Sequence, residues 1–397
     1  MKTYDLITPE GTKDFLFAEC AVRRTVEEKI RHIWESRGYA ELITPVLEFF
    51  DVFNHKSAYF PQEEMYKLVD SKGRLLVIRP DSTMPIARVV ATRLKDAVLP
   101  LRLYYNQCVY LNTPMLKGRS DQVAQTGIEL IGSASRLADL EVISAAAEVL
   151  SACTPDTFSL ELGDIGIFNE LMRQLQVDDA CAEEIRNLIE TKNYPALNDL
   201  LDSIADNEVT YALKMLPRLF GGEEVFEKAA ALLHGERMTE ILENLRAVYR
   251  DASILCENGT LTIDLGIVNR TDYYTGIILK GYLSGCGDEV LSGGRYDRLI
   301  AEFGYDVPAT GFAVYVDAIC QVLAKQGHAQ MHRTDVLVFA EQGYAMQAFA
   351  EAKALRLQGL RAEIAVQEEL AQAKQYAKAT GIARLLVIGQ ETAEVEV

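Results

Sequence analysis

Residues 109–132, VYLNTPMLKGRSDQVAQTGIELIG, contain two apolar runs separated by a polar segment with a basic tip. A proline, a glycine and two basic residues between positions 114 and 119 break the apolar pattern, which predicts two strands joined by a loop. In the second run Gln125 and Glu129 are four residues apart, so they share one face of the predicted strand. An amide and a carboxylate on an otherwise apolar face indicate a strand that lines a ligand pocket.

The composition is that of an ordinary globular protein. The chain has 397 residues, of which 49% are hydrophobic and 25% charged, and this length favours two or three domains. No run approaches the ~18–20 apolar residues that a membrane-spanning helix needs, and the first residues lack the apolar core of a signal peptide. We therefore expect a cytoplasmic protein with no membrane partner.

Cysteine and histidine spacing argues against a metal centre. The seven cysteines include no CxxC pair, and the five histidines form no HxxH or HExxH pattern. We therefore expect free thiols and no bound metal. No Walker A sequence occurs and no GxGxxG follows a strand, so we also expect no cofactor. The formal net charge of −18 also opposes a nucleic-acid partner, because such binding draws most of its affinity from lysine and arginine contacts to phosphates.

Hydrophobic periodicity predicts antiparallel strands interrupted by helices over residues 1–326, which is an α+β domain. Helical spacing covers residues 17–37, and a strand that contains Pro45 follows at 39–50. Residues 66–83 have the pattern of a hairpin. Further along the chain the pattern predicts helices at 135–152 and 312–326, strands at 261–268, 274–283 and 289–294, and an all-helical insertion at about 164–252.

The C-terminal residues have a different pattern. After a short polar linker, residues 333–397 alternate strand and helix signals, which predicts a small α/β domain with a parallel sheet.

Two adjacent tyrosines, Tyr273 and Tyr274, lie within the strand predicted around residues 274–283 or next to it. Adjacent side chains of a strand face opposite ways, so we expect one of the two phenols to point inward.

Five motifs occur in the order found in histidyl-tRNA synthetases. They are RPDST at 79–83, KGRSDQVAQTGIE at 117–129, VNRTDYYTG at 268–276, SGGRYDRLIAEFG at 292–304 and VPATGFAVYVDAI at 307–319. From about residue 8 to 325 the chain resembles this class II aminoacyl-tRNA synthetase family, and after 333 it resembles the start of the anticodon-binding domain. The resemblance implies an antiparallel sheet backed by helices, and a homodimer formed through the first helix and the Pro45 strand.

The resemblance also shows where the catalytic groups of that family are replaced. The arginine and glutamate of the FRxE pattern align with Leu111 and Thr113, and a third aligned position, in the histidine-specific motif, holds Asn269 in place of arginine. In the GxxxGxER pattern Tyr315 replaces the second glycine and Ala318 the arginine. Removing one preorganised donor typically costs ~2.7–4 kcal/mol of transition-state stabilisation. The resemblance therefore implies that this chain has no catalytic residues for aminoacylation.

More residues match the amino-acid pocket of the family than match its catalytic groups. In synthetases an acidic residue and a glutamine hold the ammonium group of histidine, and these align with Asp81 and Gln125. A glutamate and a tyrosine contact the imidazole and align with Glu129 and Tyr274. The candidate histidine-binding residues are Asp81, Gln125, Glu129, Tyr273, Tyr274 and Tyr296. The alternative is that they are inherited fold residues with no present ligand.

A synthetase-like body with recognition residues and without catalytic arginines resembles the regulatory subunits of ATP phosphoribosyltransferase. That resemblance implies a hetero-octamer with the short-form catalytic subunit, which handles ATP and phosphoribosyl pyrophosphate in the first step of histidine biosynthesis. It also implies feedback inhibition with histidine as the effector. Two alternatives are a divergent histidine–tRNA ligase and a non-enzymatic tRNA-binding paralogue.

Overall fold

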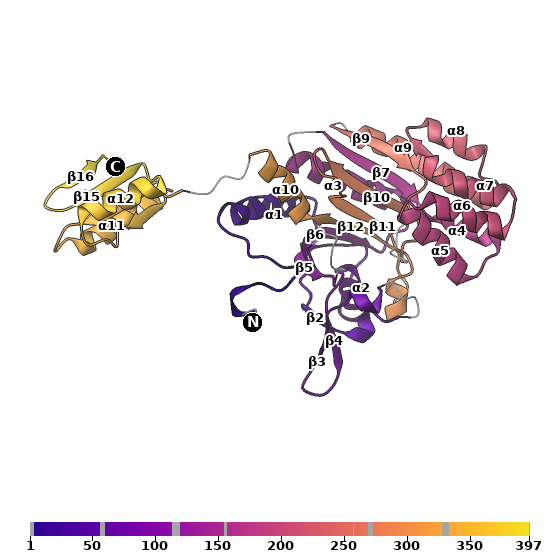
Figure 1. Cartoon of the computed structure of the whole chain (residues 1–397), viewed down its shortest axis with the longest axis horizontal. Helices are drawn as coiled ribbons and strands as arrows, with labels where there is room; N and C mark the ends of the chain where they lie inside the picture. The colour runs from indigo at the N-terminus through magenta and orange to yellow at the C-terminus, as the bar shows by residue number, and fades with distance from the viewer. Residues whose placement is uncertain are drawn as a thin grey trace. The chain divides into compact units, whose positions relative to one another are not determined.

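A computed structural model describes residues 4–55, 60–112, 120–154, 157–256, 258–268, 273–327 and 333–396. Its contacts divide the chain into two compact units (Figure 1). The first comprises residues 1–15 and 22–328, and the second comprises residues 16–21 and 329–397. Within the described ranges, no helix is long and apolar enough to cross a membrane.

A large mixed sheet forms the centre of the first unit. Its strand order is β1 (Ala40–Glu41), β5 (Leu101–Tyr110), β6 (Gln122–Ile131), β12 (Ala309–Tyr315), β11 (Leu291–Arg295), β10 (Ile277–Leu283), β7 (Phe158–Asp164), β9 (Gly259–Asp264) and β8 (Phe220–Gly221). Strands β5 and β6 pair antiparallel over their full length, as the opening stretch of sequence predicts. The central strands are all antiparallel, but the pairs β1·β5 and β7·β9 are parallel. The predicted antiparallel sheet is therefore right for the centre and wrong for these two pairs.

Helices cover this sheet beside its central strands (Figure 1). They are α1 (Ala18–Ser36), α3 (Arg136–Cys153) and α10 (Val316–Lys325). Helix α1 buries an apolar stripe that ends in Trp34, whose indole nitrogen donates to the Thr126 hydroxyl of β6 at 3.1 Å. The helix predicted at 312–326 is wrong over its first four residues. Strand β12 runs to Tyr315, because a strand buried on both faces has the same continuous apolar pattern as a buried helix.

The connection between β7 and β9 is a group of helices. They are α4 (Ile165–Leu175), α5 (Asp179–Glu190), α6 (Tyr194–Ile204), α7 (Glu208–Met215), α8 (Glu224–Ala230) and α9 (Glu236–Leu255), with the short 3-10 helix η4 (Leu216–Arg218). Side chains of Asp178 and Asn207 cap α5 and α7. The two-residue strand β8 interrupts the helical pattern that the sequence predicts. A long crossover of this kind is what parallel pairing of β7 and β9 requires.

A smaller sheet lies below the central strands in Figure 1. It has the order β2 (Leu47–Phe49), β4 (Leu75–Ile78) and β3 (Lys67–Val69), and β3 and β4 form the predicted hairpin. The strand predicted at 39–50 is wrong, because it divides around Pro45 between β1 and β2, which belong to different sheets. The buried guanidinium of Arg79 donates to the carbonyls of Thr44 and Pro45 and so fixes this break. Helix α2 (Thr83–Arg93) follows β4, and four 3-10 helices complete the unit: η1 (Tyr4–Leu6), η2 (Phe50–Val52), η3 (Gln62–Glu64) and η5 (Ile300–Phe303).

The second unit contains a four-stranded sheet. Its order is β14 (Ala362–Ile364), β13 (Val336–Ala340), β15 (Arg384–Ile388) and β16 (Thr392–Val395), with helices α11 (Ala345–Leu357) and α12 (Leu370–Thr380). Strands β14, β13 and β15 are parallel, as expected, and β16 adds an antiparallel edge that the sequence analysis missed. Separate apolar clusters cover the two faces, which is the usual arrangement of a parallel sheet.

Candidate functional site

A cavity of about 230 Å³ lies over β6, β12 and β11 of the large sheet. Its described lining residues are Phe60, Pro80, Asp81, Thr83, Tyr105, Leu111, Gln125, Glu129, Tyr273, Tyr274, Glu289, Ser292, Tyr296, Gly311, Phe312, Ala313 and Tyr315. The volume is below the ~300–1,000 Å³ typical of pockets for drug-sized ligands, so it suits a small metabolite. All six candidate histidine-binding residues therefore line one cavity.

Small residues form the floor of this cavity. Ala313 and Ser292 line it and pair with each other across β12 and β11, and Gly127, which is not among the described lining residues, pairs with Ala313 from β6. In the next row Gly311 pairs with Glu129, and a Cβ at Gly311 would lie 2.0 Å from Glu129 Oε2. Glycine at that position therefore leaves the space that the carboxyl group occupies.

Glu129 lies at the centre of one end of the cavity. Its side chain is buried, Oε1 accepts a hydrogen bond from the Thr83 hydroxyl at 2.9 Å, and Oε2 accepts one from the Tyr296 hydroxyl. Burial raises the pKa of Glu129 to about 8, and the nearby Asp81 carboxylate adds to the rise. Glu129 is therefore largely protonated at neutral pH in the empty cavity. A carboxyl with a raised pKa lowers folding stability at neutral pH, which is typical of a group kept for binding or catalysis.

Asp81 lies between β4 and α2, at the start of the helix. Its Oδ1 accepts a hydrogen bond from the backbone nitrogen of Met84 at 2.7 Å. Burial raises the pKa of Asp81 to about 6, although backbone donors of α2 and the Tyr273 hydroxyl partly oppose the rise. Asp81 is therefore mostly ionised at neutral pH and is suited to an ammonium group.

Three tyrosines surround these carboxyl groups. The ring centroids of Tyr273 and Tyr274 are 4.9 Å apart, and those of Tyr273 and Tyr296 are 5.7 Å apart. Burial raises the pKa of all three phenols well above the ordinary value, so they remain protonated hydrogen-bonding groups. The expectation that Tyr273 and Tyr274 face opposite ways is wrong. Both line the cavity because they precede β10, where strand alternation does not apply.

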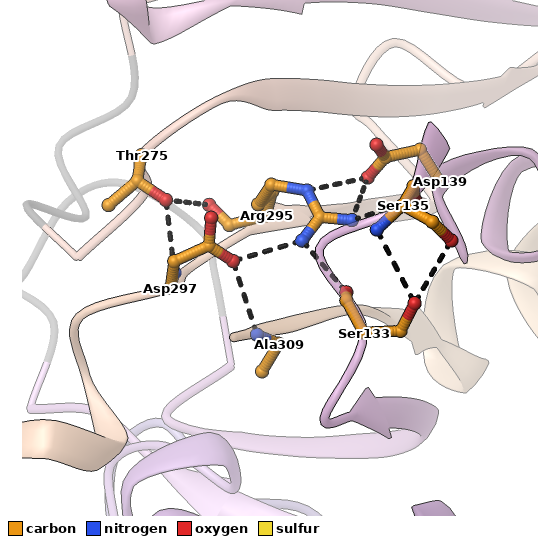
Figure 2. A network of polar contacts seen from close by, with 7 residues as sticks. All are labelled: Ser133, Ser135, Asp139, Thr275, Arg295, Asp297 and Ala309. Carbon is orange, nitrogen blue, oxygen red and sulfur yellow. Dashed lines mark hydrogen bonds and ion pairs between the residues drawn. The ribbon is translucent and has the colours of Figure 1, made fainter. Parts of the chain in front are cut away.

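A buried ion network lies next to Tyr296 in the sequence (Figure 2). The Arg295 guanidinium donates from Nε to Asp139 Oδ1 at 2.9 Å and from Nη1 to Asp297 Oδ1 at 2.9 Å. Its remaining hydrogen bonds go to the backbone carbonyls of Ser133 and Ser135. The network joins β11 to the start of α3, so Arg295 is occupied by structural partners.

The same network positions the backbone around Tyr296. Asp297 Oδ1 accepts a hydrogen bond from the Ala309 nitrogen at 3.2 Å, and the Tyr296 nitrogen donates to the Ala309 carbonyl at 2.8 Å. Thr275 adds three further contacts, because its nitrogen and its hydroxyl both donate to the Arg295 carbonyl and its hydroxyl accepts from the Asp297 nitrogen. Figure 2 shows the two contacts of the hydroxyl. Arg295 and Asp297 therefore orient the phenol that holds Glu129. The SGGRYDRLIAEFG motif contains both residues, but their sequence pattern alone assigns them no role.

The positions that align with catalytic residues of the synthetases do not all lie at the cavity. Leu111 lines the cavity, whereas Ala318 lies in the first turn of α10 and is not among the described lining residues. Thr113 and Asn269 lie outside the described residues, as do the basic residues Lys117 and Arg119 of the loop tip.

The sequence analysis missed several lining residues. Thr83, Tyr105, Ser292, Glu289 and Tyr315 all line the cavity. Thr83 could have been found, because it is the last residue of the RPDST motif and lies two positions from Asp81. The others depend on pairing between distant strands, which no local pattern reveals.

The carboxyl groups among the described lining residues belong to Asp81, Glu129 and Glu289. Together with the phenols and Gln125, they suit a small ligand that carries positive or hydrogen-donating groups. Within the described residues, no group of three or more histidine, cysteine, aspartate or glutamate side chains could hold a metal ion.

Comparison with known proteins supports this assignment of the fold. The family model for histidyl-tRNA synthetase matches residues 11–319. The chain is 42% identical over 373 residues to an ATP phosphoribosyltransferase regulatory subunit of Clostridium kluyveri, covering 93% of this chain and 95% of that protein. It is 36% identical to the protein of the same name from Clostridium botulinum (strain 657 / Type Ba4), covering 96% of this chain and 92% of that protein.

Solved structures of related proteins have a similar fold. A crystal structure described as an ATP phosphoribosyltransferase regulatory subunit/histidyl-tRNA synthetase from Bacillus halodurans matches with a TM-score of 0.82 and 27% identity, covering 94% of this chain and 97% of that one. A histidyl-tRNA synthetase from Nostoc sp. PCC 7120 matches with a TM-score of 0.79 and 22% identity, covering 98% and 96%. The second match shows a shared fold.

Proposed function

The chain belongs to the family of ATP phosphoribosyltransferase regulatory subunits, and we propose that it senses histidine in the cavity described above. Its role is regulatory and lies in histidine biosynthesis. The observation that carries the proposal is that Asp81, Gln125, Glu129 and three tyrosines line one small cavity. Binding there inhibits the first step of the pathway by feedback.

The chemistry of the lining residues supports one pose for histidine. The ammonium group lies near Asp81 and Gln125, because an ionised carboxylate and an amide oxygen both accept its hydrogen bonds. The imidazole lies against Glu129 and Tyr274, which offer partners to its two ring nitrogens. Tyr296 holds Glu129 in place by its hydrogen bond to Oε2.

The same proposal includes the loss of aminoacylation. Leu111 lines the cavity as an apolar side chain at the position that aligns with a synthetase arginine. Ala318, at a second such position, carries no donor. Transfer of an adenylyl group needs preorganised positive charge on the phosphate, which these two side chains cannot supply.

We propose that the chain acts with a short-form catalytic subunit, which holds ATP and phosphoribosyl pyrophosphate. The assembly is a hetero-octamer of four chains of each kind, and the synthetase-like core, residues 1–326, forms a homodimer through its first helix and the segment around Pro45. Residues 333–397 are a counterpart of an anticodon-binding domain and bind no nucleic acid. The seven free cysteines fit the reducing cytoplasm.

Feedback through this cavity requires histidine to bind one state of the complex better than another. We propose that it favours the low-activity arrangement. An effector that shifts the equilibrium from 1:99 to 99:1 must bind the favoured state ~10⁴-fold more tightly, so even a partial shift needs strong discrimination between states.

Reconstitution tests the proposal directly. Mixing the purified chain with a short-form catalytic subunit should produce phosphoribosyltransferase activity that neither protein shows alone, and histidine should inhibit it. ATP–pyrophosphate exchange with histidine should stay at background, and filter binding to tRNA at physiological salt should be negative. Exchange activity would indicate a divergent ligase instead, and tRNA retention would indicate a non-enzymatic tRNA-binding protein.

The affinity of the chain for histidine should be highest between about pH 6.5 and pH 8. The upper limit follows from the Glu129 pKa of about 8, and the lower from the ~6.5 of a free imidazole. Between these limits Glu129 transfers its proton to the imidazole, so the pair forms without net proton exchange. Above the upper limit the pair must take up a proton, and below the lower limit it must release one, so affinity falls by up to ~tenfold per pH unit on either side.

Calorimetric titration of the chain with histidine across this range measures the profile. The Asp81 pKa of about 6 adds to the loss on the acidic side, since a protonated Asp81 no longer pairs with the ammonium group. The Glu129→Gln variant is the control, because its amide does not titrate and its alkaline loss should be shallower. A profile that is the same in both proteins would contradict the proposed ion pair.

A further inference from the structure

The cavity extends well beyond the group of residues around Glu129. Gly311, Ala313 and Tyr315 are alternate residues of β12 and all line it, so the floor follows the strand for roughly 13 Å at ~3.3 Å per residue. Gly311 pairs with Glu129 at one end, and Tyr315 pairs with Gln125 at the other. We call the second end, formed by Gln125, Glu289, Ser292 and Tyr315, the distal end.

The Tyr315 side chain lies across the distal end. Its hydroxyl is 2.6 Å from the Ser292 hydroxyl, and Ser292 pairs with Ala313, two residues before Tyr315. The ring therefore leans back along the strand, over the small residues of the floor. A bulky side chain in this orientation reduces the space that a second ring of a ligand would need.

Glu289 brings a carboxylate to the same end. It lies two residues before the start of β11, the strand that carries Ser292, and the Tyr315 nitrogen donates to the carbonyl of the adjacent Val290 at 2.9 Å. Lys280 Nζ lies 3.1 Å from Glu289 Oε2, so the lysine is held by this carboxylate. Glu289 lines the cavity, and Lys280 is not among the described lining residues.

We propose that Glu289 and Tyr315 are specificity-determining residues, which close the distal end of the cavity to phosphorylated ligands such as nucleotides. The inference rests on the proposed function in one respect, since it takes the other end to bind an amino acid. A phosphate group placed at the distal end meets the Glu289 carboxylate. Like charges brought together in a confined site reject the wrong ligand.

Removing Glu289 should have a second effect. Lys280 would lose its partner and become available to a phosphate, so one substitution would replace repulsion by attraction. Tyr315→Ala acts on space alone. The two variants therefore separate the charge contribution from the steric one.

The test is calorimetric titration of the full chain with histidine, with ATP, and with a sulfamoyl analogue of histidyl adenylate, which is not hydrolysed. Wild type should show no detectable ATP binding, and it should bind the analogue no more tightly than histidine. Glu289→Gln and Tyr315→Ala should each raise the ratio of analogue to histidine affinity by about tenfold or more. Glu28→Gln, at an exposed position of α1, is the matched control and should change nothing.

Two outcomes would overturn the inference. If wild type binds the analogue more tightly than histidine, the distal end is open to nucleotides. If the variants leave the ratio of analogue to histidine affinity unchanged, neither Glu289 nor Tyr315 determines the ligand specificity of the distal end. If wild type binds no histidine, the proposed function fails, while the ATP titrations of wild type and Glu289→Gln still decide the inference. If thermal denaturation shows that Tyr315→Ala is not folded, the Glu289→Gln variant alone tests the inference.

Discussion

Glu129→Ala is expected to weaken histidine binding by roughly 10- to 150-fold and to relieve feedback inhibition to the same extent. This range corresponds to the ~1.5–3 kcal/mol of a hydrogen bond to a charged group. Glu129 is the buried carboxyl that we place against the imidazole, and alanine removes both its charge and its hydrogen-bonding oxygens. Titrating histidine against phosphoribosyltransferase activity of the reconstituted complex measures the shift.

Glu129→Gln should give an intermediate result. Its amide can keep one hydrogen bond with Thr83 or Tyr296, but it cannot exchange a proton with the imidazole. The retained neutral hydrogen bond contributes ~0.5–1.5 kcal/mol, which is less than the ~1.5–3 kcal/mol of a hydrogen bond to a charged group. We therefore expect histidine affinity to fall by about tenfold. The order wild type, glutamine, alanine therefore distinguishes a lost charge from a lost contact.

The exposed Glu28→Ala substitution in α1 is the control, and it should leave inhibition unchanged. Unchanged inhibition in Glu129→Ala, with the variant folded, would move the histidine site elsewhere, with the interface between regulatory and catalytic subunits as the next site to test. Loss of activity without histidine would indicate a folding defect, which thermal denaturation of the isolated chain detects.

Local periodicity predicted only part of this site, the shared face of Gln125 and Glu129, whereas Asp81, Tyr274 and Tyr296 were predicted from the resemblance to histidyl-tRNA synthetases. The four-residue spacing of Gln125 and Glu129 correctly placed both on one face of β6, where they line the cavity. The break at Pro45 was missed, since the apolar run continues through it. What divides the strand is Arg79, a residue 34 positions away, which donates to the Pro45 carbonyl at 3.2 Å.

Other features of the site depend on register between distant strands. Gly311 and Glu129 are 182 positions apart in the sequence (311 − 129). Only the pairing of β6 with β12 brings them together, so that Gly311 leaves space for the Glu129 carboxyl group. The same holds for Tyr315 and Ser292, whose contact depends on a diagonal across β12 and β11. Local periodicity carries no information about such pairing, because a shift of register leaves it unchanged.

Arg295→Met should destabilise the first unit by about 3–5 kcal/mol, the usual cost of removing one partner from a buried ion pair. Arg295 and Asp139 have side chains that are 8% and 7% exposed, and Arg295 Nη2 lies 2.8 Å from Asp139 Oδ1. Methionine is apolar and of similar length, so the change removes charge and hydrogen bonds more than volume. Asp139 would then remain buried without its guanidinium partner. Urea denaturation of the chain, followed by tryptophan fluorescence and circular dichroism, measures the loss.

The double variant Arg295→Met/Asp139→Asn should recover part of that stability, because it removes the buried charge that the single variant leaves behind. Arg31→Met is the matched control. Arg31 and Glu35 form an exposed pair at 3.0 Å, each side chain 46% exposed, so its loss should cost far less stability than the loss of Arg295. If Arg295→Met unfolds at the same urea concentration as Arg31→Met, the network in Figure 2 does not hold β11 against α3. If it is destabilised as expected, histidine affinity should fall with it, since the network orients Tyr296 and Tyr296 orients Glu129.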